Sequence, residues 1–347
     1  MEHGRFGNTD LTVSIIGLGC YGMSGAYGPA DDAESIATIR RALDLGVNLL
    51  DTSASYGKGH NHRLISEAIR GRRHEVVIHS KSGSPRDGSL DAVRGGGDPR
   101  YLRQTCEQSL KNLGIETLDV FCMSRVDPNV PVEESVGGMA DLVKEGKTRF
   151  ISLSECSAES LRRGSAVHPL ASLQMEYSSF SRDAEEQGQI DACKELCMPM
   201  MAYAVLGRGL LSAQVPTMEE MAADDIRAQL PRFHGTNIEK NLWLRSALEA
   251  VAREERHPGA ACHRLANGPE LACWSFHRTD TRREITQAPR GECARCGHCA
   301  HLRRSRGNQP HRTARRRVRH SLSNRTNAPA ERLSESLNTA RRGWGKS

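Results

Sequence analysis

The stretch V-N-L-L-D-T-S-A-S-Y-G, at Val47 to Gly57, carries the pattern that decides the fold. It opens with a short aliphatic run, Val47 to Leu50, of the kind that forms a buried strand. The run stops at a charged residue, Asp51, and polar and small residues follow. A buried strand that ends in a polar group is typical of a parallel sheet with a functional edge.

The residues before this strand predict a helix. Asp31 can serve as its N-cap, and Ile36, Ile39 and Leu43 recur at the spacing that places them on one helical face. Gly46 stands where a glycine commonly ends a helix. A helix therefore leads directly into the buried strand.

The same alternation continues over the first 256 residues and gives about seven β/α units. The expected strands are Val13 to Gly19, Val47 to Leu50, Val76 to Ile78, Leu118 to Met123, Thr148 to Leu153, Ala171 to Met175 and Pro199 to Tyr203. The other expected helices are His62 to Arg70, Pro99 to Leu113, Val132 to Glu145, Ala158 to Ala166, Ala184 to Leu196 and Glu239 to Glu254. Such apolar strands, regularly separated by helices, indicate a parallel sheet with a covered outer face.

A (β/α)8 barrel and a doubly wound sheet both fit this alternation. The turn G-L-G-C-Y-G at Gly17 to Gly22 lacks the G-x-G-x-x-G spacing of a dinucleotide-binding doubly wound domain, which favours the TIM barrel. In such barrels the chemistry lies at the carboxyl ends of the strands. Polar residues occupy six of these positions: Asp51, Lys81, Ser124, Ser154, Gln174 and Tyr203.

Composition indicates a cytoplasmic protein. Hydrophobic residues make up 37% of the chain and aromatic residues 4%, so we expect a core built mainly of aliphatic side chains. The segment from Met1 to Thr12 carries charges, and no later run reaches the length that a membrane helix needs. The 11 cysteines lack the regular spacing of a disulfide framework, which favours reduced thiols.

Charge divides the chain into two regions. The formal net charge is +6, but the residues from His257 onward contribute +13, so residues 1 to 256 carry −7. We therefore predict an acidic globular domain at residues 1–256 and an Arg-rich tail at 257–347.

An ordered set of short segments runs through the predicted barrel. These segments are L-D-T-S-A-S-Y-G at Leu50 to Gly57, V-V-I-H-S-K at Val76 to Lys81, S-R-V-D-P-N-V-P at Ser124 to Pro131, L-V-K-E-G-K-T-R at Leu142 to Arg149, L-S-E at Leu153 to Glu155, L-Q-M-E-Y-S at Leu173 to Ser178 and L-G-R-G at Leu206 to Gly209. Through them the chain resembles the aldo-keto reductase family from about Gly4 to Glu254. The D-x-x-x-x-Y-G motif by itself is moderately specific, whereas the ordered set of segments is strongly so.

The resemblance implies reduction of an aldehyde or ketone with NADPH, in which Tyr56 donates the proton. A free tyrosine has a pKa of about 10, so a nearby cation that stabilises phenolate brings it closer to the working range. Lys81 is the cation that the resemblance implies, and Asp51 is the carboxylate that holds its ammonium group. Taken singly, Tyr56 could be a loop aromatic, Lys81 a solvated charge at a strand end and Asp51 an N-cap. Their positions at strand ends and their order along the chain favour the catalytic interpretation.

The resemblance also implies a set of NADP-binding residues. Ser154 and Gln174 match positions that bond the nicotinamide carboxamide, and Tyr203 matches the aromatic residue that stacks on the ring. We also expect Tyr21 and Leu206 to contact the cofactor. No metal is expected, and the substrate is expected to be a small carbonyl compound.

Several residues depart from the family pattern. The strand that normally ends L-H-R-V-D-P has Met123-Ser124-Arg125 here, so Ser124 replaces a catalytic histidine. A serine can donate one hydrogen bond but cannot titrate near neutrality, so we expect impaired activity. Ser152 replaces a usual glycine, and Ala204 and Val205 stand where the family often has S-P.

The amino-acid sequence after Arg256 no longer matches the family. A nucleotide sequence can be written that encodes Arg256 to Pro269. When its first base is removed, the same nucleotides encode V-T-P-G-Q-L-A-I-A-W-L-M-A, which is the helix that the family would have here. A shift of reading frame near Arg256 is the simplest account. We therefore expect a barrel that is incomplete at its last β/α unit, and a disordered tail.

Two features of the tail bear on other functions. Cys293, Cys296 and Cys299, with His298 and His301, have ligand-like spacing, but a fourth regularly spaced ligand is missing. The basic run Arg303 to Arg319 lacks interleaved aromatic residues, so no specific nucleic-acid binding is expected. The main alternative to a reductase is an inactive barrel that binds the cofactor or a protein partner. The sequence leaves the oligomeric state undetermined.

Overall fold

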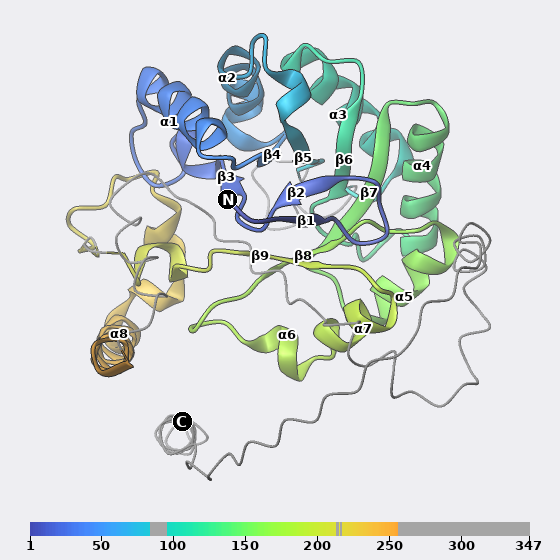
Figure 1. Ribbon diagram of the computed structural model, residues 1–347. Helices are drawn as coiled ribbons and strands as arrows, with labels where there is room; N and C mark the ends of the chain where they lie inside the picture. Colours follow the sequence, from blue (N-terminus) through green and yellow to red (C-terminus); the bar gives the residue numbers. More distant parts are fainter. Residues whose placement is uncertain (84–95, 213–214, 216, 256–347) are drawn as a thin grey trace, which may run out of the picture. The chain divides into compact units, whose positions relative to one another are not determined.

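Seven parallel strands form the frame of the protein in a computed structural model that describes residues 1–83, 96–212, 215 and 217–255. The strands follow one another in chain order around a nearly closed barrel (Figure 1). They are β3 (Leu18–Gly19), β4 (Leu49–Ser53), β5 (Val77–Lys81), β6 (Leu118–Met123), β7 (Thr148–Ser154), β8 (Leu173–Glu176) and β9 (Met200–Tyr203). The predicted parallel barrel is confirmed. Within the described ranges no eighth strand joins β9 to β3.

Helices follow most of the strands and cover the outside of the barrel (Figure 1). They are α1 (Asp32–Asp44), α2 (His60–Ala68), α3 (Pro99–Leu113), α4 (Val132–Lys144), α5 (Ala158–Val167), α6 (Asp183–Glu186) and α7 (Gln189–Glu195). Short 3₁₀ turns lie at η1 (Tyr21–Ser24), η2 (Tyr56–Gly59), η3 (Arg73–Glu75), η4 (Gly207–Gly209), η5 (Ile226–Gln229) and η6 (Pro231–Phe233). The last helix, α8 (Gly235–Glu255), packs against η6 instead. The large core cluster lies between the strands and α1 to α7.

The structure of α1 shows why its N-cap, its apolar spacing and its terminal glycine predicted a helix. The Asp31 side chain accepts a hydrogen bond from the backbone N–H of Glu34 at 2.7 Å, which is the geometry of an N-cap. Ile39 and Leu43 are buried in the core. Gly46 adopts a φ of +84°, which favours glycine at the end of a helix.

Two predicted elements are divided in the structure. The run predicted as one strand, Val13 to Gly19, contains the end of β2 (Thr12–Ser14) and the whole of β3. β2 pairs antiparallel with β1 (His3–Arg5) in a hairpin outside the parallel sheet. The predicted helix Ala184 to Leu196 becomes α6 and α7, because Gly188 between them has a φ of +81°.

The hairpin closes one end of the barrel interior. Its apolar residues Phe6, Leu11 and Val13 form a second, smaller core cluster with inward-facing residues near the beginnings of the strands, among them Leu49 and Val77. In Figure 1 this hairpin is drawn in dark blue across the ring of strands. Because side chains alternate along a strand, the next inward positions lie two residues further toward the carboxyl ends. After Leu49 and Val77 these positions are held by Asp51 and His79, which are polar.

The tail features that bear on metal and nucleic-acid binding, Cys293 to His301 and Arg303 to Arg319, lie outside the described residues. The same is true of the predicted tail at 257–347, whose disorder and boundary stay predictions. No helix in the described part of the chain is both long and apolar enough to cross a bilayer.

Candidate active site

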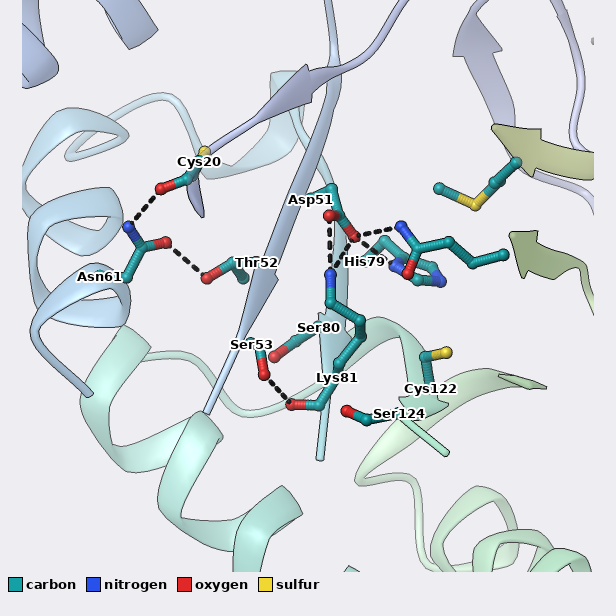
Figure 2. A network of polar contacts seen from close by, with 12 residues as sticks. Cys20, Asp51, Thr52, Ser53, Asn61, His79, Ser80, Lys81, Cys122 and Ser124 are labelled. Carbon is teal, nitrogen blue, oxygen red and sulfur yellow. Dashed lines mark hydrogen bonds and ion pairs between the residues drawn. The ribbon is translucent and has the colours of Figure 1, made fainter. Parts of the chain in front are cut away.

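The predicted pair of Asp51 and Lys81 is brought together by neighbouring strands. In the parallel register of β4 and β5, Asp51 lies opposite His79 and Ser53 lies opposite Lys81. Alternation therefore points Asp51, His79 and Lys81 to the same side of the sheet. Lys81 Nζ donates to both carboxylate oxygens of Asp51, each at 2.7 Å, as Figure 2 shows.

The carboxylate of Asp51 is buried and accepts hydrogen bonds from three side chains. Besides Lys81, His79 Nδ1 lies 2.8 Å from Oδ1, and Gln174 Nε2 donates to the same oxygen at 3.1 Å. Burial would raise the pKa of Asp51, but the Lys81 ammonium and the hydrogen bond from His79 outweigh it and hold the pKa below its usual value. Asp51 is therefore ionised at neutral pH and paired with Lys81.

Tyr56 lies beside this ion pair. It begins η2, directly after β4, and its ring centroid is 5.1 Å from Lys81 Nζ. Gly57 next to it has a φ of +55°, and a Cβ there would come within 2.9 Å of the Cβ of His60. The turn that presents Tyr56 thus requires glycine at this position. The structure brings together all three predicted members of the proton-donating group.

Tyr21 packs against the predicted proton donor. Its ring centroid lies 4.6 Å from that of Tyr56 and 5.5 Å from that of Tyr27. Asn61 fixes this region, because its Nδ2 donates to the Cys20 carbonyl at 2.7 Å. Tyr21 therefore lines the same mouth as Tyr56; its predicted contact with the cofactor stays a prediction.

Ser124 lies at the end of β6, beside the end of β5 (Figure 2). Its Oγ accepts a hydrogen bond from the backbone N–H of Gly83 at 2.8 Å. Its own backbone N–H donates to the Ser82 hydroxyl at 3.3 Å. Ser124 thus occupies the expected strand end, but its hydroxyl oxygen already serves the local backbone.

The remaining predicted cofactor-binding residues lie on β7, β8 and β9 or shortly after β9. Ser154 and Gln174 are register partners on β7 and β8, and each is only 2% exposed. Tyr203 ends β9 and is half-buried, with the Arg208 guanidinium 5.6 Å from its ring centroid. Burial, above all, raises the pKa of Tyr203 to about 12, so its phenol stays protonated at neutral pH. Leu206 precedes η4, where the next three residues all have positive φ.

Sequence reasoning missed two buried polar residues of the site, His79 and Ser152. His79 Nε2 lies 3.0 Å from the Ser152 hydroxyl, and both residues are fully buried. Strand alternation could have found His79, because counting back from Lys81 in steps of two places it on the inner face. A partly buried ion cluster was missed as well: Glu176 pairs with Arg208 at 2.9 Å and also with Arg232.

A family model described as the aldo/keto reductase family matches residues 15–264. The chain belongs to the aldo-keto reductase family. The match includes every residue that we predicted for the site and ends shortly after Arg256, where the sequence departs from the family pattern.

Solved aldo-keto reductase structures are similar to this chain. A glycerol dehydrogenase from Gluconobacter oxydans shares 28% identity, with a TM-score of 0.63 over 73% of this chain and 78% of that one. An aldo/keto reductase from Klebsiella pneumoniae in complex with NADP and acetate shares 28% identity, with a TM-score of 0.52 over 60% and 72%. A thermostable aldo-keto reductase bound to the inhibitor epalrestat shares 26%, with a TM-score of 0.53 over 63% and 79%.

Family membership and these neighbours support the oxidoreduction of carbonyl compounds with a nicotinamide cofactor. In the part of the chain that the structure describes, no group of three acidic, histidine or cysteine residues is arranged to hold a metal ion. The cytoplasmic location and the role of each site residue stay predictions.

Proposed function

We propose that this aldo-keto reductase reduces an aldehyde or ketone to an alcohol with NADPH, and that Tyr56 donates the proton. The observation that carries the proposal is the position of Lys81, whose Nζ lies 5.1 Å from the Tyr56 ring centroid and 2.7 Å from both oxygens of Asp51. A cation held there stabilises the phenolate that Tyr56 becomes when its proton leaves. Asp51 fixes the ammonium group and prevents it from moving into the solvent.

The residues on the opposite side of the mouth fit a nicotinamide cofactor. Ser154 and Gln174 offer a buried hydroxyl and a buried amide side by side, and such groups recognise a carboxamide. Tyr203 offers an aromatic surface at the end of the next strand, and Tyr21 and Leu206 extend the lining. When bound, the cofactor would supply the hydride; the chain supplies orientation and the proton.

The proton moves in one direction during reduction. Tyr56 gives its phenolic proton to the oxygen of the carbonyl group, and the negative charge that remains on Tyr56 faces Lys81. Ser124 stands where the family has a histidine; its hydroxyl accepts the Gly83 N–H and keeps one proton to donate, but it does not titrate near neutrality and so cannot assist proton transfer as a histidine can. We therefore propose that turnover is slow compared with that of family members that have the histidine.

The absence of a side chain at Ser124 that titrates near neutrality favours a second candidate function. In a barrel that binds NADPH without reducing a carbonyl, Ser154, Gln174 and Tyr203 would still bind the cofactor, but Tyr56 would donate no proton. The two functions differ in turnover and not in binding.

The test measures binding and turnover in the same preparation. NADPH binding is followed by isothermal titration calorimetry, and turnover by NADPH consumption with aromatic and aliphatic aldehydes and ketones. Tyr56→Phe should lower kcat by roughly 10²-fold or more and leave NADPH affinity unchanged. Tyr101→Phe, at a half-buried tyrosine in α3, is the matched control and should not affect turnover. Binding without turnover in the unaltered protein would establish the second function instead.

A further inference from the structure

We propose that His79 is a positioning residue for the reaction, which holds Asp51 in the orientation that keeps Lys81 against Tyr56. This inference rests on the proposed function. Its geometry is a line of contacts across three strands: Ser152 Oγ lies 3.0 Å from His79 Nε2, and His79 Nδ1 lies 2.8 Å from Asp51 Oδ1. His79 is 0% exposed, so this ring does not exchange its partners for water.

The hydrogen-bond partners assign the tautomer of His79. An ionised carboxylate can only accept, so Nδ1 carries the proton that points at Asp51. Burial lowers the pKa of His79, although Asp51 opposes this effect, so the ring is neutral near pH 7. Nε2 then accepts the Ser152 hydroxyl proton. Both hydrogen bonds therefore point the same way and direct the positive end of the imidazole dipole toward the carboxylate.

Asp51 needs this second anchor because one of its other donors has another role under the proposed function. Gln174 Nε2 donates to Asp51 Oδ1 at 3.1 Å, and the same amide is proposed to recognise the cofactor. If Gln174 turns from Asp51, His79 and Lys81 are the described donors that remain on the carboxylate. His79 thus makes the position of Asp51 independent of what Gln174 does.

The other titratable groups around this network do not ionise near neutral pH. Cys20, directly after β3, and Cys122 on β6 face Asp51 and Lys81, and burial raises the pKa of both thiols, that of Cys122 to about 12. His62 on α2 faces Lys81 from outside the barrel, and burial lowers its pKa to about 4. A change in the pH profile of a His79 variant therefore reports on Asp51, Lys81 and Tyr56.

The experiment compares His79→Leu, His79→Asn and His62→Leu. Leucine removes the donor to Asp51, whereas the asparagine amide can replace Nδ1–H. His62 is the matched control, because it is equally buried and bonds a serine, Ser80 at 3.0 Å, whereas the hydrogen bonds of Asp51 in the described part of the chain do not include it. All variants are assayed for kcat and kcat/KM against pH and for NADPH affinity. The ammonium signal of Lys81 is followed by NMR in protein labelled with ¹⁵N-lysine and assigned with Lys81→Met.

We expect His79→Leu to lower kcat by about tenfold or more, because Lys81 is no longer fixed against Tyr56. The alkaline limb of kcat/KM should move up by roughly half a pH unit, because a positive dipole end is removed from the site. The Lys81 signal should broaden or shift. His79→Asn should restore most of each property, and NADPH affinity should stay within about threefold throughout. His62→Leu should lower stability alone.

The inference is overturned if His79→Leu keeps the pH profile and the Lys81 signal of the unaltered protein, or if His62→Leu reproduces its effects. If the unaltered protein shows no turnover, the proposed function fails, and the Lys81 signal still decides the role of His79. Should His79→Leu not fold, Ser152→Ala replaces it. Ser152→Ala keeps the donor at His79 Nδ1 but removes the hydrogen bond to Nε2 that fixes the ring. It should change kcat, the pH profile and the Lys81 signal in the same direction as His79→Leu, but less.

Discussion

Replacing Lys81 with methionine tests the central ion pair through stability, without any need for turnover. Asp51 and Lys81 are 5% and 7% exposed, so the pair is shielded from water. Removing one partner of a buried pair costs about 3–5 kcal/mol, since a charge is left uncompensated. Asp51 keeps its hydrogen bonds from His79 and Gln174, so we expect the lower end, about 3 kcal/mol. For a domain of this size that loss lowers Tm by roughly 6–12 °C.

The pH dependence of this loss has a definite sign. The folded-state pKa of Asp51 lies below the ordinary aspartate value of 3.8. The pair therefore contributes stability above that pH, and the contribution disappears as the pH falls through the folded-state pKa. In Lys81→Met the carboxylate is buried without its cation, so protonation at low pH relieves it. The stability difference between the two proteins should narrow below about pH 5.

The assay is urea unfolding at pH 7 and pH 4, followed by circular dichroism. Adding Asp51→Asn to Lys81→Met removes the uncompensated charge and should recover roughly half of the loss. Equal stability of Lys81→Met and the unaltered protein at pH 7 would refute the reasoning. So would a difference that stays the same at both pH values.

Three further changes test other parts of the structure. Ser124→His should raise kcat by about 10²-fold if the site is otherwise intact, measured by NADPH consumption; no change would contradict the assigned strand end. Gly138→Ala should lower stability by about 1–3 kcal/mol in urea unfolding, because its Cβ would come within 2.6 Å of Pro99 on α3, whereas Gly137→Ala meets no atom within 4 Å and should stabilise by about 0.5–1 kcal/mol. Asp119→Ala should cost about 2–4 kcal/mol in the same assay, since the buried carboxylate accepts from the Ile78 backbone at 2.9 Å and from Arg73 at 2.7 Å; a loss below 1 kcal/mol would contradict this.

Local signals in the sequence predicted most of the fold. The helix Pro99–Leu113 and the strand Leu118–Met123 have the predicted bounds. The helix does so because Asp98 caps it, proline begins it and Gly114 ends it with a φ of +66°. The run Val13 to Gly19 was wrong as one strand. Val13 and Leu18 are both buried, but Val13 packs under the barrel in a hairpin, and hydrophobicity alone does not distinguish that position from a place in the sheet.

The site shows a similar limit. Asp51, Tyr56 and Lys81 could be predicted because they stand in motifs with fixed spacing. His79 could not be assigned a role from spacing, because its partners Asp51 and Ser152 lie on different strands, 28 and 73 residues away along the chain. Ser152 was seen only as a departure from the family pattern. The contact between them shows that the serine at this position has a partner for its hydroxyl.

The hairpin of β1 and β2 has a consequence for the chemistry at the other end of the barrel. Phe6, Leu11 and Val13 fill the space beneath Leu49 and Val77, two residues below the charged layer on the same strands. An electrostatic attraction grows as the local permittivity falls, so an apolar plug beneath a carboxylate and an ammonium strengthens their attraction. The first residues of the chain thus lower the permittivity around the proposed site at the other end of the barrel.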